Sequence, residues 1–187
     1  MTVSKLQSAL DLCGAADTAP SESSRTAQDE VLLLFDACGS NVVRYIRSLG
    51  VEPAAAQDVA QEVFLALFHH VRSGRPRDNL RGWIFRVAHN LALKHRQRQR
   101  READFVPEIE RAALAIDRSL NPEQRLAEEQ HQLRLHAVLR ALPERDRQCL
   151  SLRAEGLKYR EIANVLGISL GTVAKAVSRS LSRLGNV

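Results

Sequence analysis

The chain of 187 residues contains 44% hydrophobic but only 4% aromatic residues, which favours helices packed through alanine, leucine and valine over an aromatic-rich β fold. No stretch of about 18 apolar residues occurs, and the three cysteines are widely spaced, so we expect neither a membrane span nor a disulfide framework. The sequence also lacks a glycine-rich phosphate loop, a nucleophile elbow and zinc-ligand spacing, which predicts no metal, no cofactor and no catalytic residues.

The net charge of +5 hides an alternation along the chain. Four successive blocks carry net charges of −5, +9, −5 and +6, over residues 1–70, 71–101, 102–131 and 132–187. This order indicates two basic modules joined by an acidic connector, and two basic surfaces on one small chain point toward nucleic acid. Solvated basic faces without a partner are the alternative explanation of the charge alone.

The first predicted helix follows an extension. Residues 1–28 are rich in serine, threonine, alanine and aspartate, and we expect a flexible segment there. From Asp29, apolar residues recur at steps of three and four, which predicts a helix that Gly50 terminates. Gly39 lies in the middle and weighs against one unbroken helix.

Pro53 opens the next predicted helix, at a position where proline is tolerated. An apolar stripe runs along this helix over residues 59–71. Asp58, Gln61 and Glu62 stand at i, i+3 and i+4, so they share another face. That face is anionic and has no basic residue beside it, which distinguishes it from an ordinary solvated helix surface.

Residues 73–79 form a loop by composition, and helical periodicity resumes over residues 80–101 with a basic end. Trp83 and Phe85 are interleaved here with arginines, a pattern typical of surfaces that bind single-stranded nucleic acid. Alternatively, the two aromatic side chains belong to the core and the arginines form a solvated face.

Residues 102–129 are acidic, show no clear period and are expected to form a linker. An Asn-Pro pair at residues 121–122 supplies a cap and a first-turn proline, so it predicts a helix that runs to about Leu142. The next helix is expected over residues 143–155, where a glycine follows as a stop.

Residues 159–184 have the spacing of a helix-turn-helix unit. A short helix over residues 159–166 precedes Gly167 at the turn, and Ser169 caps a second helix that starts at Leu170. Such a unit holds its second helix rigidly so that one face enters the major groove, which is wide enough to admit it. Three residues spaced at three and four share one face of that helix: Thr172, Lys175 and Arg179. The alternative is an ordinary helical hairpin with a basic surface.

Together these motifs resemble the extracytoplasmic-function sigma factors of the bacterial sigma-70 family. Residues 58–64, DVAQEVF, are similar to the D-x-x-Q-E-V-F signature of sigma region 2, and residues 80–90 are similar to its R-x-W-L-x-x-I-A-x-N segment. Residues 142–173 resemble region 4. The resemblance runs from about Asp29 to Leu184, which is most of the chain.

The resemblance implies an all-α chain of two small helical domains, with region 2 over residues 29–101 and region 4, the helix-turn-helix, over residues 130–187. Such factors bind the β′ and β subunits of core RNA polymerase and direct it to promoters, and they make or break no bond themselves. The implied partners also include promoter DNA and an anti-sigma factor. The resemblance implies action in the cytoplasm without insertion into a membrane.

The resemblance also assigns residues to three sites. Docking on the basic-rich coiled coil of the β′ subunit is expected from Asp58, Gln61, Glu62 and Phe64. Opening of the −10 element and binding of its non-template strand are expected from Arg75, Arg77, Asn79, Arg81, Trp83, Arg86, His89, Asn90, Lys94 and Arg98. Recognition of the −35 element is expected from Arg160, Ser169, Leu170, Gly171, Thr172, Lys175, Arg179 and Arg183.

The chain departs from the family pattern at both DNA sites. Where family recognition helices often carry lysine and arginine, this chain has Ala174 and Ala176, so fewer side chains can reach base edges. Lys94 stands where the family often has aspartate and adds positive charge beside the −10 site. Two other classes stay open: a regulator with a helix-turn-helix of the response-regulator type, which does not need the motifs at 58–64 and 80–90, and a helical scaffold that does not bind DNA.

Overall fold

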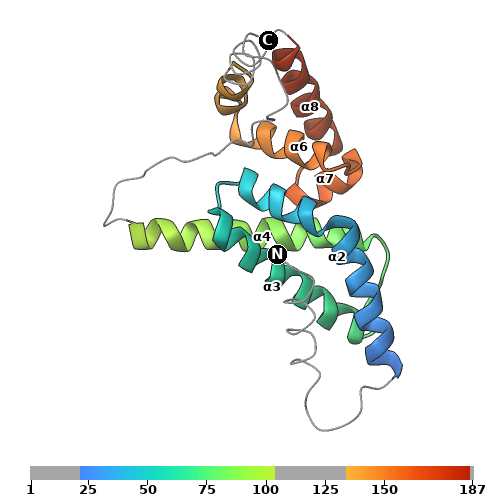
Figure 1. Ribbon diagram of the computed structural model, residues 1–187. Coiled ribbons are helices and arrows are strands. Elements are labelled where there is room, and N and C mark those ends of the chain that lie inside the picture. The colour runs from blue at the N-terminus through green and yellow to red at the C-terminus, as the bar shows by residue number, and fades with distance from the viewer. Residues whose placement is uncertain (1–21, 104–133, 186–187) are drawn as a thin grey trace, which may run out of the picture.

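The computed structural model describes residues 22–103 and 134–185. These residues contain helices and no strand, which confirms the all-α class. Figure 1 shows the arrangement of six labelled helices: α2 (Glu22–Ser48), α3 (Pro53–Arg72), α4 (Leu80–Ala103), α6 (Glu144–Ala154), α7 (Tyr159–Leu166) and α8 (Leu170–Leu184). No helix in these two ranges combines the length and the apolar character that a membrane crossing needs.

The N-terminal half packs α2, α3 and α4 around an apolar core. α2 begins at Glu22, seven residues before the expected start at Asp29, and the buried Ala27 shows that the added turns reach the core. Pro53 is the first residue of α3, as predicted. Eight side chains of α3 are buried: Ala56, Val59, Ala60, Val63, Phe64, Leu67, Phe68 and Val71.

Gly39 does not break α2, and packing explains why a glycine stands there. A Cβ atom at this position would lie 3.1 Å from Cδ2 of Phe35. The Phe35 ring packs edge to face on the Phe64 ring, with 5.0 Å between the ring centroids. Glycine therefore leaves room for an aromatic contact between α2 and α3, at the cost of about 1 kcal/mol of helix propensity.

The C-terminal half contains the predicted helix-turn-helix. α6 ends near Gly156 (φ +85°), and Gly167 (φ +64°) makes the turn between α7 and α8 in a backbone conformation that favours glycine. The helix predicted to end at about Leu142 is observed over residues 134–141, while its first part lies outside the described residues. Residues 1–21 of the expected extension and residues 104–129 of the expected linker also lie outside them.

The two halves share one core in this structure. α7 packs against α4, and α6 packs against α2 (Figure 1). Buried side chains of the C-terminal half, Leu152 and Leu157 among them, belong to the same apolar cluster as Phe85 of α4. The helix-turn-helix therefore lies directly on the bundle, although the sequence separating the halves is long.

Candidate nucleic-acid and protein interfaces

The anionic face predicted on α3 is present. Asp58 and Glu62 are exposed and Gln61 is half-buried. Within the two described ranges, neither carboxylate forms an ion pair. Phe64 has no exposed surface and packs on Phe35, so in this conformation it lies in the core behind the anionic face.

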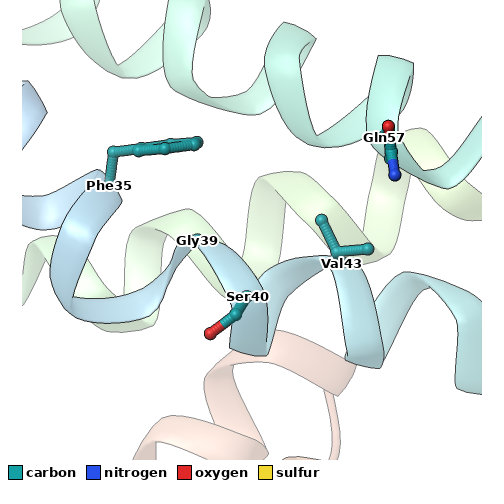
Figure 2. A pocket seen from close by; sticks show the side chains of 5 residues that line it. All are labelled: Phe35, Gly39, Ser40, Val43 and Gln57. Carbon is teal, nitrogen blue, oxygen red and sulfur yellow. The ribbon is translucent and has the colours of Figure 1, made fainter. Parts of the chain in front are cut away.

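A shallow hollow adjoins the anionic face. It has a volume of about 230 Å³ and lies between α2 and α3, where Gln57 precedes Asp58 (Figure 2). The α2 side supplies Phe35, Gly39, Ser40 and Val43. The surface around Asp58 thus combines two exposed carboxylates with a neighbouring depression that contains aromatic and aliphatic groups.

The loop before α4 is anchored by Asn79. Its Oδ1 atom accepts a hydrogen bond from the backbone N–H of Gly82 at 3.1 Å, which satisfies one of the free donors at the start of α4. A Cβ atom on residue 82 would lie 2.5 Å from Nδ2 of Asn79, so this cap requires glycine. Asn79 also has a positive φ of 55°. Its contacts thus position the start of α4.

Trp83 and His70 connect the same loop to α3. The two rings lie 4.6 Å apart between centroids, and Nε2 of His70 is 2.9 Å from the carbonyl oxygen of Pro76. Trp83 is half-buried, so part of its ring faces solvent. Phe85, in contrast, is fully buried and packs on Tyr45. Of the two alternatives for these aromatics, Phe85 is a core residue, and Trp83 lies at the surface boundary.

His89 is a core residue in this conformation. Its Nδ1 atom lies 2.9 Å from the hydroxyl of Tyr45, and the side chain is buried. Burial lowers the pKa of His89 and raises the pKa of Tyr45. The spacing of Phe85, His89 and Ala92 along the buried stripe is the sequence signal that indicates a core position for this histidine.

The basic residues of the candidate −10 site are exposed, but at least three of them, Arg77, Arg81 and Arg98, interact within the chain. Arg77 forms an ion pair with Glu30 at 2.8 Å. The guanidinium of Arg81 donates a hydrogen bond to the backbone carbonyl of Glu155 in the C-terminal half. The other exposed residues of the set are Arg75, Asn79, Arg86, Asn90 and Lys94.

The helix-turn-helix is capped at both of its helices. In α7, the carboxylate of Glu161 accepts a hydrogen bond from the backbone N–H of Lys158 at 2.6 Å. In α8, Oγ of Ser169 accepts a hydrogen bond from the backbone N–H of Thr172 at 3.1 Å, as the sequence predicted. Thr172 is half-buried, and the other residues of the −35 set are exposed: Arg160, Ser169, Leu170, Gly171, Lys175, Arg179 and Arg183.

Arg179 connects α8 to α6. Its Nε and Nη2 atoms donate hydrogen bonds to the two carboxylate oxygens of Asp146, at 2.7 and 2.8 Å. The Asp146 side chain is only 3% exposed, and the guanidinium holds its pKa below the usual value. Sequence reasoning did not find Asp146, because it precedes its partner by 33 residues and lies in another helix.

Glu155 connects the two halves. Both oxygens of its carboxylate accept hydrogen bonds from Arg44 of α2, each at 2.6 Å. Arg81 contacts the backbone carbonyl of the same residue, and Arg96 of α4 forms an ion pair with Glu144 at 3.0 Å. The candidate −10 surface thus contacts the C-terminal half through Arg81, an arrangement that the sequence did not predict.

The chain matches two family models: Sigma-70 region 2 over residues 34–102, and Sigma-70, region 4 over residues 132–184. It is 35% identical over 131 residues to the ECF RNA polymerase sigma factor SigE of Mycolicibacterium smegmatis, a match that covers 69% of this chain and 50% of SigE. It is 31% identical over 146 residues to the RNA polymerase sigma-H factor of Pseudomonas aeruginosa, which covers 74% of each. With the ECF RNA polymerase sigma factor EcfG of Rhodopseudomonas palustris, identity is 30% over 138 residues, covering 73% of each chain.

The fold is similar to that of two proteins solved in complexes. One is the sigma factor RpoE bound to the anti-sigma factor NepR from Bartonella quintana, with a TM-score of 0.64, 22% identity and coverage of 85% of this chain and 94% of that one. The other is CnrH in complex with the cytosolic domain of CnrY, with a TM-score of 0.56, 22% identity and coverage of 89% and 92%.

Proposed function

The chain belongs to the extracytoplasmic-function RNA polymerase sigma factors of the sigma-70 family, and from this we propose that it binds core RNA polymerase and directs it to promoters. One observation carries this proposal: the same chain combines an unpaired anionic face on α3, an exposed basic segment at the start of α4 and a capped helix-turn-helix. Neither a helical scaffold nor a simple regulator needs all three surfaces.

The first contact is with polymerase. The exposed carboxylates of Asp58 and Glu62, with Gln61 beside them, form the surface that docks on the basic coiled coil of the β′ subunit. Charge complementarity supports this assignment, because both carboxylates are without a cationic partner in the described part of the chain. Phe64 contributes by fixing the backbone of α3 from the core side.

The second contact is with the opened −10 element. Exposed arginine and lysine side chains of the loop and of α4 bind phosphates of the non-template strand, while the accessible part of Trp83 offers a stacking surface. Flipped bases leave the duplex stack at a cost of roughly a few kcal/mol, which binding of the single strand offsets. Asn79 positions the helix that carries these groups.

The third contact is with the −35 element. The exposed face of α8 enters the major groove, and its N-terminal residues meet the base edges. Two exposed arginines supply phosphate contacts: Arg160 in α7 and Arg183 near the end of α8. Arg179 fixes the angle of α8 on α6 through Asp146.

The protein acts by binding and performs no chemistry of its own. We place its action in the cytoplasm, with core polymerase, and include an anti-sigma factor among its partners. The resemblance of the fold to a sigma factor solved with the anti-sigma factor NepR supports that partner class.

The docking surface is tested by charge reversal. Asp58→Lys with Glu62→Lys should reduce the affinity for core polymerase at least tenfold, because like charges then face the basic coiled coil. Glu52→Lys is the matched control, since Glu52 is an exposed acid just before α3 and outside the face. Titration of labelled protein with core polymerase measures the effect. Equal affinities for the double variant and the control would remove this face from the interface.

A further inference from the structure

The first turn of α8 has few polar side-chain groups that are free to read bases. In helix-turn-helix proteins, base edges are contacted by the N-terminal residues of the second helix. Here Oγ of Ser169 accepts the N–H of Thr172 and lies 2.8 Å from Oγ1 of Thr172, so both hydroxyls already bond within the cap. Gly171 has no side chain. Direct polar reading by this turn is therefore weak.

The arginine farther along α8, Arg179, is also already bound within the protein. Arg179 donates two hydrogen bonds to Asp146, whose side chain is 3% exposed. Turning the guanidinium toward a guanine would leave a buried carboxylate without its partner, which is costly. Lys175 is the exposed basic residue that remains on the first two turns, and it acts as a point charge without the planar geometry of arginine.

Leu170 stands at the first position of α8 with 51% of its surface exposed. Helical spacing places Ala174 and Leu181 near the same edge of the helix, while Lys175 lies toward the opposite edge of the exposed face. The end of α8 that meets the base edges thus presents a large apolar side chain where a polar reader is usual. In the major groove, the apolar group that distinguishes one base from the others is the C5 methyl of thymine.

We propose that Leu170 is a specificity-determining residue that selects a thymine in the −35 element through contact with its C5 methyl group. This inference rests on the proposed function, because it requires α8 to enter the major groove. The partner that covers Leu170 is duplex DNA, because Leu170 lies next to the capped first turn of α8 and the exposed Lys175 lies on the same part of that helix. Selection then depends on an apolar contact more than on hydrogen bonds.

The test uses the holoenzyme made from the full chain and core polymerase. Upstream elements are first selected from a randomised promoter library, and each selected thymine is then replaced by deoxyuridine, which removes only the methyl group. Burial of one such group corresponds to about a fourfold change in affinity. We expect one position at which deoxyuridine weakens binding about fourfold for the unchanged protein and Leu170→Ala abolishes that difference.

Leu181→Ala is the matched control, because Leu181 is 55% exposed on the same helix but lies near its C-terminal end. It should keep the discrimination of the unchanged protein. Two results would overturn the inference while leaving −35 recognition intact. In one, the unchanged protein binds equally well with and without every methyl group; in the other, Leu170→Ala discriminates as the unchanged protein does. Loss of polymerase affinity in Leu170→Ala with methyl discrimination retained would assign the leucine to a protein contact and overturn it too. Binding that does not depend on the upstream element would instead refute the proposed function of α8.

Discussion

The contact between Glu155 and Arg44 should control how the two halves separate. Glu155→Ala removes the carboxylate that accepts both hydrogen bonds from Arg44, while the backbone carbonyl that Arg81 contacts remains. The proposed −10 site includes Arg81, whose guanidinium contacts Glu155 of the C-terminal half, so binding of promoter DNA at that site would require the halves to move apart. The variant should therefore shift the protein toward an open form.

The size of the shift from closed to open molecules follows from the exposure of the two side chains. Each hydrogen bond to a charged group contributes about 1.5–3 kcal/mol when it is shielded from solvent. The Glu155 side chain is 5% exposed, but that of Arg44 is 64% exposed, so solvent screens the pair and the two bonds together contribute less than their sum. We expect a loss of about 2 kcal/mol, which raises the ratio of open to closed molecules about 30-fold.

Single-molecule fluorescence transfer between dyes on α3 and α8 counts open and closed molecules directly. The matched control is Glu144→Ala, which breaks a second ion pair between the halves, at 3.0 Å to Arg96. The Glu144 side chain is 55% exposed, so this change should shift the ratio less than about threefold. A double-mutant cycle with Arg44→Ala isolates the pair.

Two results would refute this reasoning. In the first, Glu144→Ala opens the protein as much as Glu155→Ala, so burial does not decide the strength of the contact. In the second, the effects of Arg44→Ala and Glu155→Ala add independently, so the two side chains do not stabilise the closed form through each other.

Three further predictions concern residues that position the interfaces. Gly82→Ala should displace Asn79, lower the free energy of unfolding in urea by about 1 kcal/mol and weaken binding of a −10 single strand. An unchanged midpoint of urea unfolding would argue against the Asn79 cap. Phe64→Ala should cost about 3–5 kcal/mol in the same assay, and a loss of polymerase affinity without destabilisation would return Phe64 to the docking surface. Because burial lowers the pKa of His89, the unfolded chain binds its proton more readily, so stability should fall as the pH drops below about 6.5. His89→Gln should flatten that slope in thermal unfolding, whereas an identical slope would assign the dependence to other groups.

Helix positions could be predicted from sequence because they depend on local spacing. The proline start of α3, the glycine turn before α8 and the serine cap at Ser169 each reflect a backbone requirement of one or two residues. The early start of α2 and its passage through Gly39 were missed, because they depend on packing against other helices. For Gly39 the decisive neighbour, Phe35, contacts a ring of α3.

The candidate sites could be predicted less well than the fold. Side-chain chemistry indicated the exposed acids of α3 and the basic residues around α4, but not which of them have partners within the chain. Arg179 and His89 suit nucleic acid by type, yet one is bound to Asp146 and the other lies against Tyr45. Such pairings join helices that are distant in sequence, as does the contact of Arg44 with a residue 111 positions later.

Mapping of transcript starts tests the central claim most directly. Core RNA polymerase is incubated with genomic DNA from the source of the chain, with and without the full protein, and the 5′ ends of the transcripts are sequenced. The account predicts new start sites that appear only with the protein and share one −10 and one −35 element. Identical start sites with and without the protein would contradict it.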